Sequence, residues 1–153
     1  WAGVSPAAPY RHYSDREELM ADVAKRGFEE FEQALRKAWN DGQPEPIEAF
    51  ERAGKAYLEF ARKHPAYYSA MFEASVPIAK NAELREAGER AFNVLRGAAE
   101  KLAANAPAGK RPPATMMALH VWALSHGIAS LFARGDEGRR SLPLWVPVRN
   151  HSV

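Results

Sequence analysis

The feature that most constrains this chain is the regular spacing of its apolar side chains, which recur every three or four residues between sites occupied by proline, glycine or asparagine. Such spacing places apolar groups on one face of a helix and excludes the alternation expected of strands. Pro44, Pro46, Pro65 and Pro77 separate the segments, because proline fits a first helical turn and ends a helix that reaches it. The pattern predicts an all-α bundle with helices over residues 14–39, 47–64, 65–76, 82–103 and 114–134.

The start of the first long helix carries a specific local signal. Ser14-Asp15-Arg16-Glu17 has the form of a capping box, which predicts that a helix begins at Ser14. Before it, Gly3 can supply a tight turn, Ser5 can cap a helix, and Pro6 suits a first helical position. A short helix that follows a glycine turn and meets a long helix is typical of the second half of a helix-turn-helix. The alternative is an ordinary helical hairpin turn with an exposed arginine and histidine.

Composition excludes several classes of protein. The chain has no cysteine, which removes disulfide scaffolds, thiolate metal sites and cysteine nucleophiles together. No apolar stretch reaches the length of a membrane span and no signal pattern opens the sequence, so we expect a cytoplasmic protein without membrane contact. The formal net charge is only +2, and four arginines fall from Arg134 onward, which leaves the bundle without a broad basic face.

The sequence also lacks the usual signatures of an enzyme. The five histidines never stand four residues apart, so no helical metal site is expected. Neither a glycine-rich phosphate loop nor a Gly-x-Ser-x-Gly elbow is present. Ser125 and His126 are adjacent on a helix and therefore do not face each other. We expect no catalytic residue, no cofactor and no metal, although an enzyme with a buried cavity stays open as a third hypothesis.

Residues 114–134 are apolar on almost every side of the predicted helix. In a protein outside a membrane such a helix must be buried on more than one side, so a second copy of the chain is the natural partner, and a homodimer through residues 114–134 is expected. Trp122 and His126 share one face of this helix, and Gly127 would let a neighbouring helix come close. The alternative for His126 is a core histidine that bonds to a carbonyl or hydroxyl group.

Aromatic and methionine side chains are frequent in the later helices, which suits a pocket for an apolar ligand with few polar contacts. Packing in the core is the alternative role for each single member. The residues predicted to bind a ligand are Tyr57, Phe60, Tyr67, Tyr68, Met71, Phe72, Met116, His120, Trp122 and His126.

Three strings together resemble the tetracycline repressor-like (TetR) family of bacterial regulators. The first spans residues 2–19 and ends its short helix in Tyr10-Arg11-His12-Tyr13. The second is His64-Pro65 followed by Tyr67-Tyr68 and Met71-Phe72. The third, Val121-Trp122 to His126-Gly127, resembles the subgroup named for its Trp, His and Gly residues.

The resemblance implies a transcriptional regulator, acting as a repressor, that binds operator DNA as a dimer and responds to a small apolar or aromatic effector. It implies a helix-turn-helix whose first helices precede this segment of the family and are missing here. The alanines are implied to lie near base edges, and the tyrosine, histidine and arginines near phosphates. The residues implied to contact DNA are Ser5, Ala7, Ala8, Tyr10, Arg11, His12 and Arg16.

The expected organisation has three parts. Residues 1–26 form the partial DNA-binding domain, residues 27–134 form the ligand-binding and dimerisation domain, and residues 135–153 form a non-helical tail. The tail departs from the family, whose members commonly end in another helix. A ligand-binding or scaffold protein without DNA-binding function is the alternative, because the charges of the bundle are balanced.

Overall fold

The computed structural model describes residues 8–74 and 76–132, and this part of the chain is helical without a strand. The predicted all-α fold is confirmed. The elements are α1 (Ala8–Trp39), η1 (Asn40–Gly42), α2 (Pro46–Lys63), α3 (Pro65–Phe72), η2 (Ile78–Lys80), α4 (Ala82–Ala104) and α5 (Ala114–Phe132), where η marks a single 3-10 turn.

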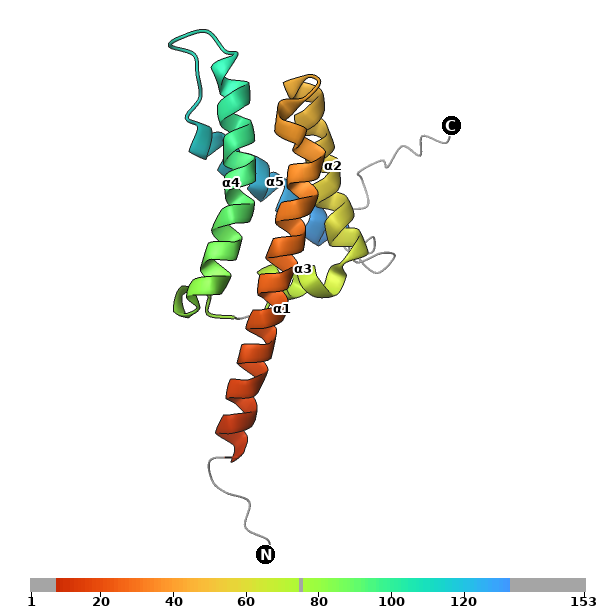
Figure 1. Ribbon diagram of the computed structural model, residues 1–153, viewed down its shortest axis with the longest axis vertical. Helices are drawn as coiled ribbons and strands as arrows, with labels where there is room; N and C mark the ends of the chain where they lie inside the picture. Colours follow the sequence, from red (N-terminus) through yellow and green to blue (C-terminus); the bar gives the residue numbers. More distant parts are fainter. Residues whose placement is uncertain (1–7, 75, 133–153) are drawn as a thin grey trace, which may run out of the picture.

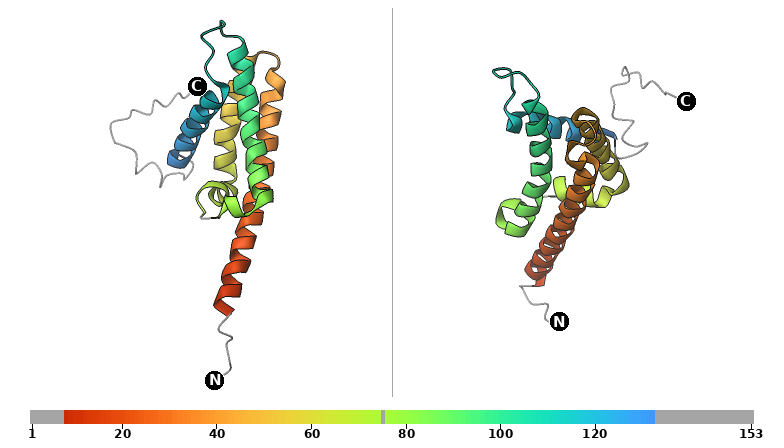
Figure 2. Two further views of the ribbon diagram at one scale, coloured as in Figure 1. Left: turned by 90° about the vertical axis from the view of Figure 1, so that its left-hand side faces the viewer. Right: turned by 45° about the horizontal axis from the view of Figure 1, so that its top comes forward.

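The long helix α1 runs between α2 and α4 and contacts both, while the short α3 packs against its middle (Figure 1). Helix α5 crosses behind these helices and contacts α4 and α2. Turned views show that α5 lies on one side of the bundle and that the first turns of α1 project beyond the other helices (Figure 2). The bundle is therefore packed around the C-terminal two thirds of α1.

Local chemistry explains most helix ends. The Glu45 carboxylate accepts hydrogen bonds from the amides of Ile47 and Glu48 at 3.0 and 3.2 Å and so caps α2, while Asn81 caps α4 through the amide of Leu84 at 3.0 Å. Pro65 occupies the first turn of α3. After α1, Gly42 adopts a φ of +76°, a conformation that favours glycine, and the chain turns toward α2. These ends agree with the sequence prediction.

The prediction that a helix begins at Ser14 is wrong. Helix α1 begins at Ala8 and passes through Ser14 without a break, so the short helix and the long helix are one element in the described chain. Inside a continuous helix the amides near Ser14 bond to carbonyls one turn earlier and need no side-chain cap. None of the described elements lies beside the first turns of α1, so no packing forces the chain to bend there (Figure 1).

The apolar spacing alone would place Leu19 on the buried stripe of α1, but its side chain is 62% exposed. Glu17, Glu18 and Ala21, on another side of the helix, border the segment that carries Val76 and Pro77. The buried stripe starts at Ala21 and Ala24 and continues through Phe28, Phe31 and Leu35. The period of the stripe is as predicted, and only its extent differs.

The core joins helices that are far apart in sequence. Phe31 of α1 packs edge-on against Tyr57 of α2, with ring centroids 4.9 Å apart, and lies 5.1 Å from the Phe60 ring. Such aromatic pairs contribute roughly 0.5–1.5 kcal/mol each beyond the area they bury. Toward the end of α1, Trp39 covers a second cluster built from alanines of α2 and α4. Small side chains let these helices approach closely.

Ion pairs connect α1 to α4 along the outside of the core. Lys25 pairs with Glu83 at 2.5 Å, and Arg90 lies 3.2 Å from Glu32 and 3.7 Å from Glu29. At the far end, Lys101 reaches Asp41 of the η1 turn at 3.2 Å. Because most of these groups are exposed, each pair contributes little to stability but favours one register of the two helices.

Helix α5 is only partly covered by its own chain. Ala118 and Ala129 are buried, whereas Met116, Leu119, Leu124 and Leu131 are between 47% and 67% exposed. Within the described residues, no helix is long and apolar enough to cross a membrane. The predicted tail, residues 135–153, lies outside the described residues.

Candidate effector site between α3 and α5

Aromatic rings from four helices meet where α3 passes α5. The aromatic cluster consists of Phe28, Phe31, Tyr57, Tyr68, Phe72, Trp122 and His126. Phe72 occupies its middle, with its ring centroid 4.8 Å from that of Tyr68, 5.1 Å from His126 and 6.1 Å from Trp122. The cluster therefore links α3, the predicted ligand-binding segment, to both α1 and α5.

A hydrogen bond crosses the cluster. The Tyr68 hydroxyl lies 2.6 Å from Nδ1 of His126, and Ser130 Oγ lies 3.4 Å from Nε2 of the same ring. A neutral imidazole with its proton on Nε2 accepts the Tyr68 proton at Nδ1 and directs its own N–H toward Ser130. His126 thus bonds to a hydroxyl, as the core alternative in the sequence analysis had it, and it also stands beside a cavity.

Burial keeps both tyrosine hydroxyls of the cluster protonated. It raises the pKa of Tyr57 far above its ordinary value, with a further rise from the nearby Tyr68 hydroxyl and an opposing effect of the Trp122 N–H. Burial likewise raises the pKa of Tyr68, although the neighbouring Tyr57 and Ser130 hydroxyls oppose the rise. These groups act as hydrogen-bonding groups and not as charges.

The Tyr57 hydroxyl is buried without a hydrogen-bond partner among the described residues. Tyr68 and Trp122 lie close enough to influence its pKa, but no described atom meets the geometry of a hydrogen bond to it. An unsatisfied buried hydroxyl costs about 1–3 kcal/mol. The aromatic cluster therefore holds one polar group whose hydrogen-bonding capacity is unused.

The first cavity beside the cluster is apolar. It has a volume of about 300 Å³, and its walls come from α1, α3, η2, α4 and α5. Arg85 and Glu89 are exposed and stand at its edge, while aromatic, methionine and isoleucine carbons form the walls. We call it the apolar cavity, and it is lined by Phe28, Met71, Phe72, Ile78, Arg85, Gly88, Glu89, Phe92 and Trp122.

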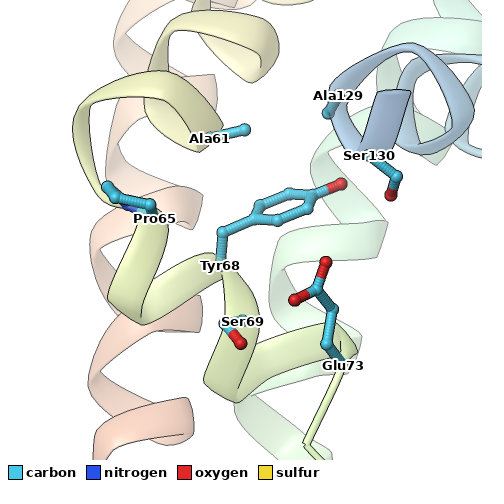
Figure 3. A pocket seen from close by; sticks show the side chains of 7 residues that line it. All are labelled: Ala61, Pro65, Tyr68, Ser69, Glu73, Ala129 and Ser130. Atoms are coloured by element: carbon cyan, nitrogen blue, oxygen red, sulfur yellow. The ribbon is translucent and has the colours of Figure 1, made fainter. Parts of the chain in front are cut away.

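The second cavity carries hydroxyl groups. It has a volume of about 320 Å³ and lies between the ends of α2 and α3 and the last turns of α5. Figure 3 shows the Tyr68 ring crossing it, with the hydroxyl directed toward Ser130. We call it the hydroxyl-lined cavity, and it is lined by Ala61, Pro65, Tyr68, Ser69, Glu73, Ala129 and Ser130.

The structure brings together several of the predicted ligand-binding residues. Met71, Phe72 and Trp122 line the apolar cavity, Tyr68 lines the hydroxyl-lined cavity, and His126 stands between them. Tyr57 is buried beside them in the core.

Other predicted residues lie elsewhere. Phe60 lines a third cavity, between α1 and α2, and the half-buried Tyr67 lies beside His64 and Gly27. Met116 and His120 are exposed on the outer side of α5, away from both cavities beside the cluster. The role of each in binding stays a prediction.

Sequence reasoning missed four wall residues. The sequence did not predict a binding role for Phe28, Ile78, Gly88 or Phe92, which line the apolar cavity. No sequence signal connects them, since the cavity exists only where their helices meet. Ser130 was also missed, although it follows Trp122 and His126 at the same four-residue spacing and could have been found from that spacing.

For most of the predicted DNA-binding residues, the structure describes no side chain. Ser5 and Ala7 lie outside the described residues, and for Ala8, Tyr10, Arg11 and His12 only the helical backbone is described. Arg16 is exposed on α1. Their contact with DNA stays a prediction. Among the described residues, no group of three histidine or carboxylate side chains is placed to hold a metal ion.

Comparison with known proteins identifies the fold family. The chain is similar to a protein of unknown function from Rhodococcus sp. RHA1, with a TM-score of 0.68 and 28% sequence identity over 93% of this chain and 72% of that one. No curated protein matches it significantly. The sequence profile of the tetracyclin repressor-like C-terminal domain matches residues 50–142, which is more than half of the chain and includes all residues that line the two cavities except Phe28. The chain therefore belongs to the tetracycline repressor-like family, and the predicted family is confirmed, while its Trp-His-Gly subgroup stays a prediction.

Proposed function

We propose that this protein is a cytoplasmic transcriptional repressor of the TetR type, which binds operator DNA as a dimer and responds to a small, largely apolar or aromatic effector. The apolar cavity is the single observation that carries this proposal. It is lined by three of the residues predicted to bind a ligand, and one of its walls belongs to the helix that bears the predicted DNA contacts.

Helix α1 connects the two predicted activities. Phe28 lines the apolar cavity, and the same helix continues without interruption to Arg16 and to the backbone of Arg11 and His12. Gly27 lies against Met71, since a Cβ at Gly27 would stand only 2.7 Å from the Met71 sulfur. A ligand that displaces Met71 or Phe72 therefore acts on α1 directly. It regulates DNA binding if it favours one position of α1 over the other.

The exposed side of α5 supports a dimer. Leucine and methionine side chains on this helix stay between 47% and 67% exposed although the helix is apolar almost throughout. A second copy of the chain, packed against residues 114–134, would remove this surface from water. A dimer would also supply two DNA-reading ends, as recognition of a palindromic operator requires.

A ligand-binding or scaffold protein without DNA-binding function is the second candidate. One observation favours it: in the described chain the first turns of α1 continue the long helix, so no separate recognition helix is present among the described residues. The balanced charge of the bundle agrees with this alternative. Neither candidate requires catalysis.

The deciding experiment measures DNA binding by the intact protein. We expect footprinting on promoter DNA of its own gene to reveal a protected palindrome, with an affinity that falls as salt rises. Arg16→Ala should weaken binding and lower the salt dependence, whereas Arg62→Ala, on the exposed face of α2, should change neither. Naphthalene, an apolar aromatic probe, should alter the affinity for DNA. The absence of site-specific protection under all salt conditions would favour the scaffold candidate.

A further inference from the structure

The two cavities beside the aromatic cluster lie on different sides of α3, where it packs beside α5. Residues from Pro65 to Glu73 line the hydroxyl-lined cavity along the whole length of α3, whereas Met71 and Phe72 line the apolar cavity. Along α5, Trp122 lines the apolar cavity and Ser130, two turns later, lines the hydroxyl-lined cavity. The cavities therefore follow each other in a groove along α5.

A pair of rings divides this groove. Phe72 and His126 stand between the cavities, with ring centroids 5.1 Å apart. Phe72 is half-buried and borders the apolar cavity, and its ring also packs against Tyr68 and Trp122 at centroid distances of 4.8 and 6.1 Å. His126 lies 2.6 Å from the Tyr68 hydroxyl. A ligand that occupies both cavities therefore has to displace the Phe72 ring, and a change of its rotamer is the smallest movement that does so.

The two ends differ in chemistry. The walls of the apolar cavity offer carbon atoms of aromatic and aliphatic side chains. The other end offers the hydroxyls of Tyr68, Ser69 and Ser130 together with the Glu73 carboxylate, and none of the described residues that line it is lysine or arginine. A carboxylate or phosphate group would need such a cation when it leaves water. A tyrosine hydroxyl can donate one hydrogen bond and accept further ones, so Tyr68 keeps hydrogen-bonding capacity beside its bond to His126.

We propose that the effector is an elongated, neutral amphiphile whose apolar body fills the apolar cavity and whose single hydroxyl or carbonyl group passes Phe72 to reach Tyr68 and Ser130. This inference rests on the proposed function in one respect, namely that an effector binds beside the aromatic cluster. It adds the shape, charge and polarity of the ligand. It also assigns Tyr68 and Ser130 to recognition of the polar group.

The test is calorimetric titration of the intact protein with a homologous series of linear alcohols from 1-hexanol to 1-dodecanol, with toluene as a short probe that has no polar group. We expect toluene to bind in the apolar cavity alone. The affinity of the alcohols should rise with length and show an added gain once the hydroxyl reaches Tyr68. The carboxylate of matching length, decanoate, should bind at least about tenfold more weakly than 1-decanol, because its charge loses water without a cation to replace it.

Three variants locate the polar group. Tyr68→Phe and Ser130→Ala should each weaken the binding of 1-decanol by about five- to tenfold, the range expected for the loss of one hydrogen bond. The affinity for toluene should stay unchanged. Ser125→Ala is the matched control, because Ser125 lies on α5 but lines neither cavity. This variant should change the affinity for neither ligand. Circular dichroism verifies that all three variants fold.

The outcomes separate this inference from the proposed function. If toluene binds but the affinity of the alcohols does not rise with length, the proposal of an amphiphilic effector is wrong. The same holds if Tyr68→Phe and Ser130→Ala both bind 1-decanol with the affinity of the wild type. An apolar effector would then remain the proposal. If decanoate binds as tightly as 1-decanol, the proposal that the polar group of the effector is neutral is wrong. If neither toluene nor any alcohol binds, this inference and the effector site of the proposed function are overturned together.

Discussion

The Tyr68 hydroxyl lies 2.6 Å from Nδ1 of His126 and so joins α3 to α5 across the aromatic cluster. Tyr68 is buried, so removing its hydroxyl leaves Nδ1 without a protein partner. We expect Tyr68→Phe to lower the free energy of unfolding by about 1–2 kcal/mol in urea denaturation. The control is Tyr67→Phe, since the half-buried Tyr67 makes no hydrogen bond to the described residues through its hydroxyl. An equal loss in both variants would contradict the hydrogen bond.

A second tyrosine should behave in the opposite way. The Tyr57 hydroxyl is buried and has no hydrogen-bond partner among the described residues, so Tyr57→Phe removes an unsatisfied group and keeps the ring. We expect the free energy of unfolding to stay level or to rise by up to about 1 kcal/mol. Urea denaturation beside Tyr68→Phe gives the comparison. A loss above about 1 kcal/mol would show that the Tyr57 hydroxyl is bonded in solution, for example to a buried water molecule.

Gly27 permits the close contact between α1 and α3. An alanine Cβ at this position would stand 2.7 Å from the sulfur and 2.9 Å from Cγ of Met71, a side chain that is itself buried. We expect Gly27→Ala to lower the free energy of unfolding by about 1 kcal/mol or more, despite the higher helix propensity of alanine.

The matched control for this contact is Gly54→Ala. Gly54 lies inside α2, and a Cβ there would meet no atom within 4 Å. This substitution should raise the free energy of unfolding by up to about 1 kcal/mol. Thermal denaturation should therefore move the two midpoints in opposite directions. Stabilisation by both alanines would refute the close approach of α3 to α1.

The ion pair between Lys25 and Glu83 predicts a pH dependence. A hydrogen bond from Lys25, followed by its charge, lowers the pKa of Glu83 below 4.5, and Glu83 in turn raises the pKa of Lys25 above 10.5. The carboxylate therefore contributes stability above pH 4.5, and this contribution disappears as the pH falls through its lowered pKa. The ammonium contributes below pH 10.5 and loses its contribution as the pH rises through its raised pKa.

We therefore expect the difference in melting temperature between the wild type and Glu83→Gln to be present at neutral pH and to vanish in acid. Because Glu83 is exposed and Lys25 is only partly buried, the difference should be small and should shrink further with added salt. Glu86→Gln, one turn along α4, is the control, since Glu86 forms no ion pair with the described residues. A difference that persists below the lowered pKa of Glu83 would mean that the pair does not stabilise the fold.

The exposed side of α5 predicts a change in oligomeric state. Leu124 is 67% exposed in the single chain, and in the proposed dimer it is covered by the second copy. Leu124→Glu would bury a charge there, so we expect it to convert the dimer to a folded monomer in analytical ultracentrifugation. Ile47→Glu is a matched control, because Ile47 is 69% exposed on α2, outside residues 114–134. Dimers in both variants would place the interface elsewhere.

The sequence by itself determined the all-α class and most helix boundaries within the bundle, although α3 ends at Phe72 and not at residue 76. Proline at the first turn of α2 and α3, asparagine before α4 and glycine after α1 act on their own backbone neighbourhood, so their effects can be predicted without knowledge of the fold. The family strings also identified Met71, Phe72 and Trp122, which the structure places around one cavity.

Only the tertiary structure decided which faces are buried and where the cavities lie. The capping box at Ser14 does not start a helix, because no described element packs beside the first turns of α1, and Leu19 is exposed because neighbouring segments pack on another side of the helix. The bond from Tyr68 to His126 joins residues 58 positions apart, and Phe28 and Phe92 meet the same cavity from different helices. Contacts of this kind arise from the crossing of helices, which local periodicity does not specify.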